Sequence, residues 1–237
     1  MNGLIGKKYI LVEKIGEGSF GSVYKAENIR TKELVAIKVE KRNDIGLLKN
    51  ETKIYQYLNY YKNNVGIPKL YWFGVDEEYN YMAIQLLGKP INTMDCLNQM
   101  LNIVEYIHSK GLIHRDLKPD NFLYDENKKF IYLIDYGFSK TYKGLIQTKS
   151  NKQIIGTPNY VSIRVLEGEE GNRRDDLESL VYIMYFLLKK KIDVKDKYLI
   201  LKKETDIPKN ILLFFEYCRE LEFEEEPNYL YLSSLLL

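Results

Sequence analysis

Residues 113–137 read I-H-R-D-L-K-P-D-N-F-L-Y-D-E-N-K-K-F-I-Y-L-I-D-Y-G. Two short apolar runs, residues 121–124 and 130–134, flank a polar turn, which is the pattern of a β-hairpin. Polar and charged side chains stand at both ends of this hairpin, with Asp116, Lys118 and Asn121 before it and Asp135 after it. The sequence therefore predicts a short hairpin with chemically active groups at its two ends.

The groups at the two ends resemble the catalytic segment of protein kinases, H-R-D-L-x-x-x-N followed by D-F-G, with Tyr136 in the Phe position. The resemblance implies that Asp116 orients and deprotonates a substrate hydroxyl and that Lys118 neutralises the moving phosphoryl group. It also implies that Asn121 and Asp135 hold Mg²⁺. His114 belongs to the same motif, but we expect it to pack and hydrogen-bond within the loop rather than to transfer protons.

Upstream, the glycine-rich stretch G-E-G-S-F-G at residues 16–21 lies between two β-type runs. A lone G-x-G-x-x-G is weak evidence, because a dinucleotide-binding fold requires a helix directly after it. Here the continuation, residues 22–27, alternates like a strand. Strand, glycine loop and strand is the arrangement of the flap that covers the phosphates in kinases. We expect the following residues to contact ATP: Ile15, Gly16, Glu17, Gly18, Ser19, Phe20, Gly21, Val23, Ala36, Lys38, Ile84, Leu86, Leu87, Leu123 and Ile134.

Lys38 closes a V-A-I-K motif in an apolar run, residues 34–39, and is the candidate contact for the α- and β-phosphates. A lysine with apolar neighbours on both sides needs an acidic partner. The pattern over residues 47–58 predicts a helix, and Glu51 is its most central acid, so we expect a Lys38–Glu51 ion pair. Leu86 and Leu87 are expected at the hinge that meets the adenine ring, although these apolar residues have an equally good interpretation as core.

Downstream, a helix is predicted over residues 94–109 and ends at Gly111. The run 180–188 is apolar nearly all round and predicts a buried helix. Asp176 lies at the start of this helix, where its carboxylate can either cap the helix or hold the backbone of the catalytic loop. We expect an α+β, two-lobed kinase fold in a single domain over residues 1–237, with a small β-rich lobe to about residue 87 and a larger helical lobe from residue 88.

Composition excludes several other classes. The chain has 237 residues, of which 45% are hydrophobic and 29% charged, which is typical of a soluble globular protein with a substantial core. Its net charge of +2 gives no general reason to expect binding to nucleic acid or membranes. Cys96 and Cys218 form no C-x-x-C motif, which indicates a reducing compartment and core filling. No run is long enough for a signal peptide or a membrane span. We therefore expect an intracellular monomer, in the cytoplasm or nucleus.

Several further segments resemble the casein kinase 1 family. These are G-N-R-R-D-D-L-E-S-L at residues 171–180, N-V-G-I-P at 64–68, E-Y-I-H-S-K at 105–110, and S-I-R at 162–164, where most protein kinases have A-P-E. The similarity runs from about Tyr9 to about Leu232. It implies Ser/Thr specificity, use of ATP with Mg²⁺, activity without phosphorylation of the activation segment, and protein substrates with acidic or phosphorylated residues near the target.

The residues that would recognise a substrate phosphate are Arg115, Lys152 and Lys197. Lys152 and Lys197 match basic positions of the family, but Asn159 stands where the family has an arginine. Arg115 could instead pair with a nearby acid. The several lysines after Gly137 predict either an acidic or phosphorylated substrate or a solvated loop.

A second hypothesis is a catalytically inactive, pseudokinase-like binding scaffold. The chain is shorter than the family between Pro90 and Asp95 and in the activation segment, and Tyr136 replaces phenylalanine. Pseudokinases typically lose the counterparts of Lys38, Asp116 or Asp135, however, and all three are present. The sequence therefore favours an active enzyme.

Overall fold

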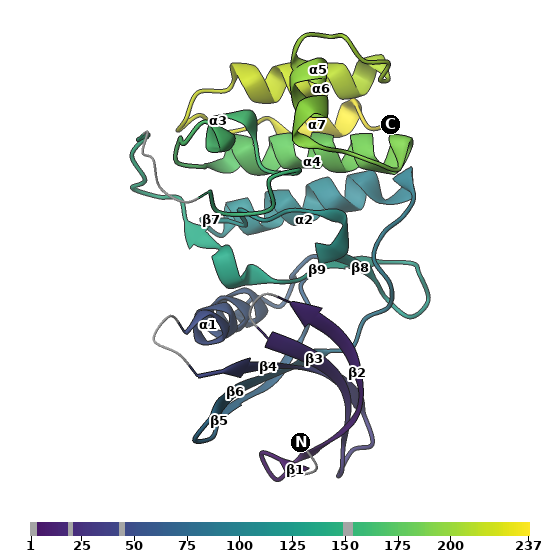
Figure 1. The fold of residues 1–237 in the computed structure, drawn as a ribbon, viewed down its shortest axis with the longest axis vertical. Coiled ribbons are helices and arrows are strands. Elements are labelled where there is room, and N and C mark those ends of the chain that lie inside the picture. Colours follow the sequence, from purple (N-terminus) through teal and green to yellow (C-terminus); the bar gives the residue numbers. More distant parts are fainter. Residues whose placement is uncertain (1–3, 19–20, 43–45, 149–153) are drawn as a thin grey trace.

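The computed structural model describes residues 4–18, 21–42, 46–148 and 154–237. A curled antiparallel sheet with one helix beside it forms one part of the molecule, and a bundle of helices forms the other (Figure 1). The hairpin region lies between the two parts. The chain passes from the sheet to the helices between Gln85 and Met94. This is the α+β, two-lobed arrangement expected from the sequence.

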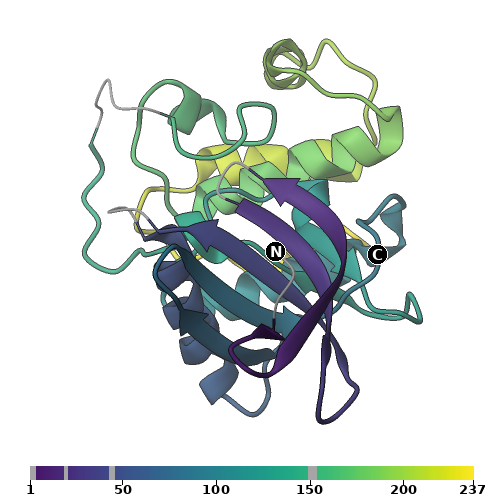
Figure 2. The same cartoon turned by 60° about the horizontal axis from the view of Figure 1, so that its bottom comes forward.

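The sheet has six strands in the order β1-β2-β3-β4-β6-β5, each antiparallel to its neighbours (Figure 2). Its strands alternate between two faces: Val35, Ile37 and Val39 are buried in a core of their own, whereas Ala36 and Lys38 point to the other face, towards the helical part. The strands are β1 (Leu4–Ile5), β2 (Tyr9–Gly18), β3 (Gly21–Asn28), β4 (Leu34–Lys41), β5 (Leu70–Val75) and β6 (Tyr79–Gln85).

Helix α1 (Leu47–Tyr60) lies beside the sheet and contacts the short 3₁₀ helix η3 (Tyr136–Phe138). Its apolar positions Leu48, Tyr55 and Leu58 are buried, and so is Glu51 on the same side. The helix predicted over residues 47–58 is therefore confirmed, and it continues to Tyr60.

The predicted hairpin is confirmed as strands β8 (Phe122–Tyr124) and β9 (Ile131–Leu133), which pair in the register Phe122–Leu133. The segment before it contains β7 (Leu112–Ile113) and the 3₁₀ helix η2 (Pro119–Asn121), and β10 (Lys140–Thr141) follows η3 and pairs with β7. The active groups predicted at the ends of the hairpin thus lie in η2, in the loop before it, and between β9 and η3.

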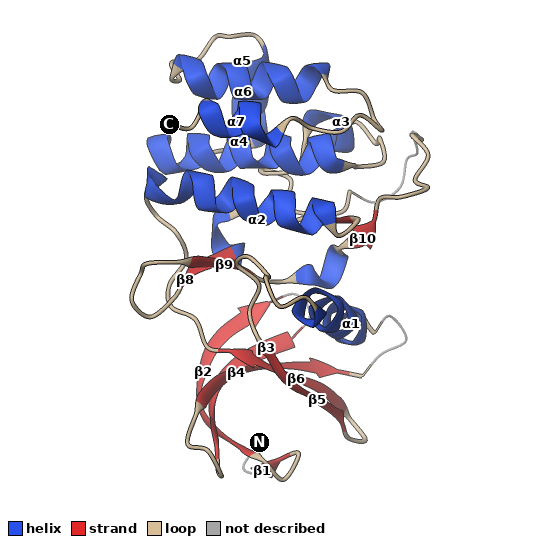
Figure 3. Cartoon of the chain, turned by 180° about the vertical axis from the view of Figure 1, so that it is seen from behind, coloured by secondary structure: helices blue, strands red, loops and turns tan. Residues whose placement is uncertain are grey.

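Helix α4 (Arg173–Lys189) lies at the centre of the helical part (Figure 3). Its residues are buried along most of its length. It packs against α2 (Leu97–Ser109) on one side and α6 (Lys209–Glu220) on the other, so the predicted buried helix is confirmed. The remaining elements are η1 (Met94–Cys96), α3 (Ile163–Leu166), α5 (Val194–Leu201) and α7 (Tyr229–Ser234).

Both cysteines are buried free thiols, as expected for core filling. Gly111 ends α2 with a φ of 78°, in the left-handed region that suits glycine. Among the described residues, no helix is both long and apolar enough to cross a bilayer.

Candidate active site

The structure brings Lys38, Glu51 and Asp135 together from three elements. Lys38 Nζ of β4 is 2.7 Å from Glu51 Oε2 of α1 and 2.9 Å from Oδ1 of Asp135, which lies between β9 and η3. The ion pair predicted between Lys38 and Glu51 is confirmed. Burial disfavours the charged form of Lys38, but the two carboxylates outweigh this effect and raise its pKa above the ordinary value. The ammonium therefore remains charged at neutral pH.

Asp135 is directed at Lys38 by the packing of its neighbour, Tyr136. The Tyr136 ring is buried and lies edge-on between Tyr55 and His114, with ring centroids 5.1 Å apart in both cases. Asp135 itself has a φ of 66°, in the left-handed region that non-glycine residues adopt at a cost. Although burial opposes ionisation, the charge of Lys38 dominates and lowers the pKa of Asp135. An ionised carboxylate thus faces the ammonium.

The catalytic-loop candidates also converge. Asp116 is 4% exposed, and its Oδ2 accepts a hydrogen bond of 2.7 Å from Lys118 Nζ. Its Oδ1 accepts two more, from the Thr157 backbone N–H at 2.9 Å and from the Thr157 hydroxyl at 2.7 Å. The Asn121 amide Nδ2 donates to the backbone carbonyl of Asp116 at 2.9 Å. These bonds fix the carboxylate that the sequence predicts as the base.

Thr157 is a site residue that our reading of the sequence missed. Its hydroxyl lies within hydrogen-bonding distance of both Asp116 and Lys118, at 2.7 Å and 3.2 Å. The available signal was the G-T-P sequence at residues 156–158, which follows the polar segment after β10. Gly156 is required beside it, because its φ is 103° and a Cβ there would lie 2.4 Å from the Arg115 carbonyl oxygen.

Asp176 holds the backbone of the catalytic loop. Its Oδ2 accepts from the His114 N–H at 2.7 Å, and its Oδ1 accepts from the Arg115 N–H at 2.9 Å. His108 Nε2 lies 3.0 Å from the same carboxylate. Burial works against its ionisation, but the bonds from His108 and the loop prevail and lower the pKa of Asp176. Two roles were considered for Asp176, capping the helix or holding the backbone of the catalytic loop. The structure supports the role in the catalytic loop.

His114 packs and hydrogen-bonds in the loop, as expected. The Asp116 N–H donates to Nδ1 at 3.3 Å, and Nε2 lies 3.1 Å from the Ile134 carbonyl oxygen. Burial lowers the pKa of His114. A neutral ring protonated on Nε2 satisfies both contacts.

The described residues expected around ATP lie on the sheet, in the segment after β6, and in and next to the hairpin β8–β9. Val23 lies opposite Lys38, and Ala36 lies opposite Ile84, so these side chains share one face. Leu123 lies in β8, and the Ile134 N–H directly after β9 donates to the Asn121 carbonyl at 2.9 Å. The paired ends of β2 and β3 contain Gly16, Glu17, Gly18 and Gly21, next to Ile15. Leu86 and Leu87 lie half-buried in the segment after β6. Ser19 and Phe20 lie outside the described residues.

The donor set suits a metal held jointly with a nucleotide. In the described residues, no three His, Cys, Asp or Glu side chains are grouped to hold a metal ion. Asp135 and Asn121 supply one carboxylate and one amide oxygen, and Mg²⁺ in proteins is commonly bound by one or two carboxylates together with substrate phosphates. The residues present therefore fit a metal–nucleotide complex better than a metal alone.

Of the three candidates for substrate phosphate, the structure describes Arg115 and Lys197. Lys197 is fully buried, its Nζ donates to the carbonyls of Pro158 and Val161, and it lies 4.5 Å from the centre of the Tyr182 ring. Burial lowers its pKa to about 7. The prediction that Lys197 recognises a phosphate is therefore wrong for this structure, because its ammonium is enclosed by protein. Lys152 lies outside the described residues.

Arg115 takes the alternative that we considered for it and pairs with an acid. Its Nε donates to the Phe138 carbonyl at 2.7 Å, and Nη1 lies 3.8 Å from Glu170. Asn159, at the position where the resembled family has an arginine, donates to the Ile192 carbonyl at 3.1 Å.

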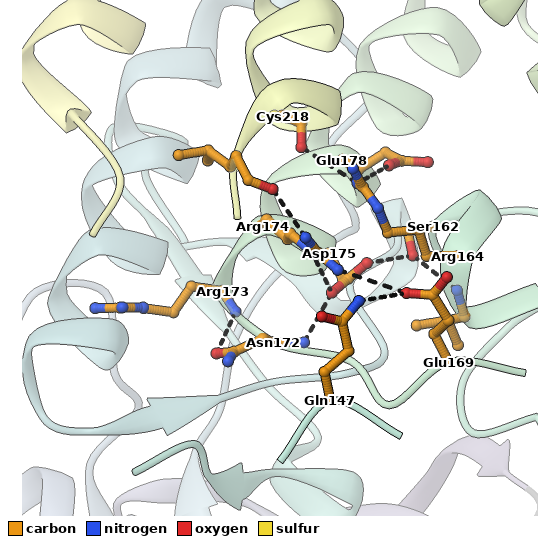
Figure 4. Close-up of polar contacts among 12 residues, drawn as sticks. Gln147, Ser162, Arg164, Glu169, Asn172, Arg173, Arg174, Asp175, Glu178 and Cys218 are labelled. Carbon is orange, nitrogen blue, oxygen red and sulfur yellow. Dashed lines mark hydrogen bonds and ion pairs between the residues drawn. The ribbon is translucent and has the colours of Figure 1, made fainter. Parts of the chain in front are cut away.

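The S-I-R sequence joins α3 to α4 and α6 (Figure 4). The Ser162 hydroxyl donates to Asp175 at 2.5 Å, and burial raises the pKa of Asp175 to about 6. Arg164 donates to the backbone carbonyls of Cys218 and Arg219 and lies 3.9 Å from Glu178. The departure from A-P-E therefore has a structural function of its own.

Residues 9–229 match the family model described as the protein kinase domain. The chain therefore belongs to the protein kinases. Members of this class transfer a phosphoryl group from ATP to proteins with the help of a divalent metal, and the geometry described above is consistent with that chemistry.

Proposed function

We propose that this protein is a Ser/Thr protein kinase of casein kinase 1 type that uses ATP and Mg²⁺. The observation that carries the proposal is the Asp116 carboxylate, which is oriented by Lys118 and Thr157 and lies on the same loop as Asn121. A base that is already oriented and a cation beside it are what in-line phosphoryl transfer requires from the protein. We also propose that residues 1–237 act as one domain and as a monomer in the cytoplasm or nucleus.

Each side chain has a defined task in this proposal. Asp116 accepts the proton of the substrate hydroxyl, and Lys118 offsets the charge on the transferring group. Lys38, oriented by Glu51, contacts the nucleotide phosphates, and Asn121 with Asp135 would hold Mg²⁺. The metal supplies charge neutralisation at the phosphates when it is bound.

The position of the Thr157 hydroxyl supports Ser/Thr specificity. This hydroxyl donates to Asp116 at 2.7 Å and lies 3.2 Å from Lys118, so the base accommodates a threonine-sized alcohol in a hydrogen-bonded position. The casein kinase 1 resemblance of the S-I-R and R-R-D-D-L-E-S-L segments supports the same specificity.

Substrate choice follows the resemblance in part. We propose protein substrates with acidic residues, or phosphorylated ones, near the target. Lys197 does not contribute, because it is buried. Lys152 remains a candidate for these contacts, whereas the Arg115 guanidinium already lies 3.8 Å from Glu170 and would have to exchange this partner for a substrate phosphate.

The test is phosphate transfer from labelled ATP with Mg²⁺ to a set of matched peptides. Two peptides have a target serine, one of them with phosphoserine three residues earlier, and a third has tyrosine in place of the target serine. We expect transfer to the serine peptides, none to the tyrosine peptide, and none by Asp116→Asn. Measurable ATP binding without transfer to any peptide or to casein would instead favour the binding-scaffold hypothesis.

The metal role makes a separate prediction. We expect Asp135→Asn to abolish transfer, because the neutral amide removes the only carboxylate proposed to hold Mg²⁺. Asp206→Asn, at a fully exposed position, is the matched control and should transfer at the wild-type rate. Retained transfer by Asp135→Asn in the same assay would exclude the role assigned to this carboxylate.

A further inference from the structure

Glu170 lies between two cations beside the catalytic loop. Its Oε1 is 3.2 Å from Lys140 Nζ and 3.8 Å from Arg115 Nη1. Arg115 directly precedes the proposed base, and Lys140 begins β10, in the segment that follows Asp135. The Glu170 and Arg115 side chains are only 26% and 18% exposed, so solvent screens their interaction incompletely. The Glu170 carboxylate thus compensates the charge of Arg115 in the catalytic loop and of Lys140 in the segment that follows Asp135.

Glu170 belongs to the loop between α3 and α4. This loop also contacts the segment after β10 through hydrogen bonds that do not involve the Glu170 carboxylate. The Glu170 N–H donates to the Thr148 carbonyl at 2.9 Å, and the Gln147 amide donates to Glu169 at 3.1 Å (Figure 4 shows the second contact). In a protein kinase this segment is the activation segment. The loop between α3 and α4 therefore contacts the activation segment through its backbone and through the Glu169 and Glu170 side chains, and it contacts the catalytic loop through the Glu170 carboxylate.

The conformation of Arg115 is one that needs support. Its φ is 69°, in the left-handed region that non-glycine residues adopt at a cost. Asp176 fixes its backbone, and the Phe138 carbonyl accepts from its Nε at 2.7 Å. Of the two acids that stabilise the charged guanidinium, Glu170 and Asp176, Glu170 has the larger effect. The position of Arg115 in turn sets the position of Asp116, its neighbour in the chain.

In kinases that are switched on by phosphorylation, the added phosphate orders the activation segment by pairing with arginine. We propose that Glu170 supplies this anion permanently, so that the catalytic loop and the activation segment are positioned without a phosphate. Glu170 is a positioning residue, because it acts through Arg115 and Lys140. The inference rests on the proposed kinase function and deepens it, since it makes the unmodified enzyme active and places Arg115 in contact with an internal acid. A substrate phosphate could reach Arg115 only by displacing Glu170.

The test uses Glu170→Ala in the full chain, with the peptide that lacks phosphoserine. We expect kcat to fall about tenfold, because the loss of roughly one charge-assisted contact corresponds to a factor of this size. The KM for ATP should stay close to the wild-type value. The Glu170→Asp variant keeps the charge and should recover part of the loss. Glu167→Ala is the matched control, because Glu167 is an exposed glutamate of the same loop, and it should behave like the wild type.

Sulfate provides the decisive measurement, because a merely structural defect would not respond to an anion. We expect sodium sulfate to restore kcat of Glu170→Ala towards the wild-type value, relative to sodium chloride at the same ionic strength. The wild type and Glu167→Ala should show no such gain. The Glu170→Ala/Lys140→Ala double variant should lose the rescue, because one of the two cations that hold the ion is gone.

Two results would overturn the inference: a kcat of Glu170→Ala equal to that of the wild type, or a loss of kcat that sulfate does not restore. If Glu170→Ala does not fold, as judged by thermal unfolding, Glu170→Gln keeps the side-chain shape and the same sulfate comparison applies. Absence of transfer by the wild type would contradict the proposed kinase function itself, so the two failures are distinguishable.

Discussion

Tyr136 carries a hydroxyl that is buried without a partner. Its ring fills the space between Tyr55 and His114, where the kinase motif has a phenylalanine, and in the described part of the chain the hydroxyl forms no hydrogen bond. Burial raises the pKa of Tyr136 well above the ordinary value, so the hydroxyl stays neutral. An unsatisfied buried hydroxyl costs about 1–3 kcal/mol, so this residue destabilises the conformation that presents Asp135 to Lys38.

We expect Tyr136→Phe to raise the free energy of unfolding by about 1–2 kcal/mol, because the ring contacts stay and the unsatisfied group is removed. Tyr182→Phe is the matched control: its hydroxyl is also buried but donates to Glu178 at 2.6 Å, so its removal should lower the free energy of unfolding. Urea unfolding followed by circular dichroism measures both. A stability change of the same sign in the two variants would contradict this account of Tyr136.

The meeting of the motif residues could be predicted from the sequence, whereas the surroundings of the Lys197 side chain could not. Asp116, Lys118 and Asn121 lie close together along the chain, so their meeting depends on local structure alone. The surroundings of Lys197 depend instead on α5 packing under residues 158–161, which are far away in the sequence. Whether a lysine faces solvent or a pair of carbonyls is decided by such tertiary contacts.

Among the elements, the start of α4 combines buried charge with helix capping. Asn172 and Asp175 form a capping box, in which the Asp175 carboxylate accepts from the Asn172 N–H at 2.8 Å. The same carboxylate accepts from Ser162, which joins α3 to this helix. Elements with strong periodicity, such as α1 and α4, were predictable. The tie between α3 and α4 was not, because it is made by polar side chains that also suit an exposed turn.

Asp175 predicts a pH dependence of stability. Its pKa is raised from 3.8 to about 6 in the folded protein, so the stability gained by protonating it is fully present below pH 3.8 and is lost as the pH rises through about 6. We therefore expect the wild type to lose about 1 kcal/mol of stability relative to Asp175→Asn when the pH is raised from about 5 to about 7.5.

Urea unfolding of both proteins across this range provides the measurement. Asp196→Asn is the matched control, because Asp196 holds the corresponding position in the capping box of α5 and is less buried. Its stability relative to the wild type should vary less with pH. A pH-independent difference between the wild type and Asp175→Asn would show that burial does not perturb this carboxyl.

For the whole molecule, the site is assembled from both parts of the fold. Lys38 comes from the sheet, Glu51 from the helix beside it, and Asp135 from the segment next to the helical part. The overall arrangement was predictable, because the glycine-rich stretch, V-A-I-K and the catalytic segment each identify one portion of the same known fold. An acidic partner for Arg115 was one of two alternatives that the sequence left open, but no motif identified Glu170 as that acid.

A ligand that contacts both the sheet part and the helical part should raise the free energy of unfolding of the protein. We expect saturating ATP with Mg²⁺ to raise the thermal unfolding temperature of the wild type, since a ligand at about 100 times its Kd adds roughly 2.7 kcal/mol. Lys38→Met should lose most of this increase because the phosphate contact is gone. Lys41→Met, an exposed lysine on the same strand, should retain it. Equal shifts in the two variants, measured by differential scanning fluorimetry, would argue against Lys38 as a phosphate contact.

The anchoring of the catalytic loop by Asp176 has a consequence for how such an enzyme can diversify. Because Asp176 of the buried helix α4 holds the backbone of this loop, the position of the proposed base depends on the interior of the molecule. The segment between β10 and α3 can then change in length or composition while the proposed base keeps its place, provided that Gly156 and Thr157 are kept. Insertions and deletions in this segment can thus change which substrates bind, while the proposed catalytic residues keep their positions.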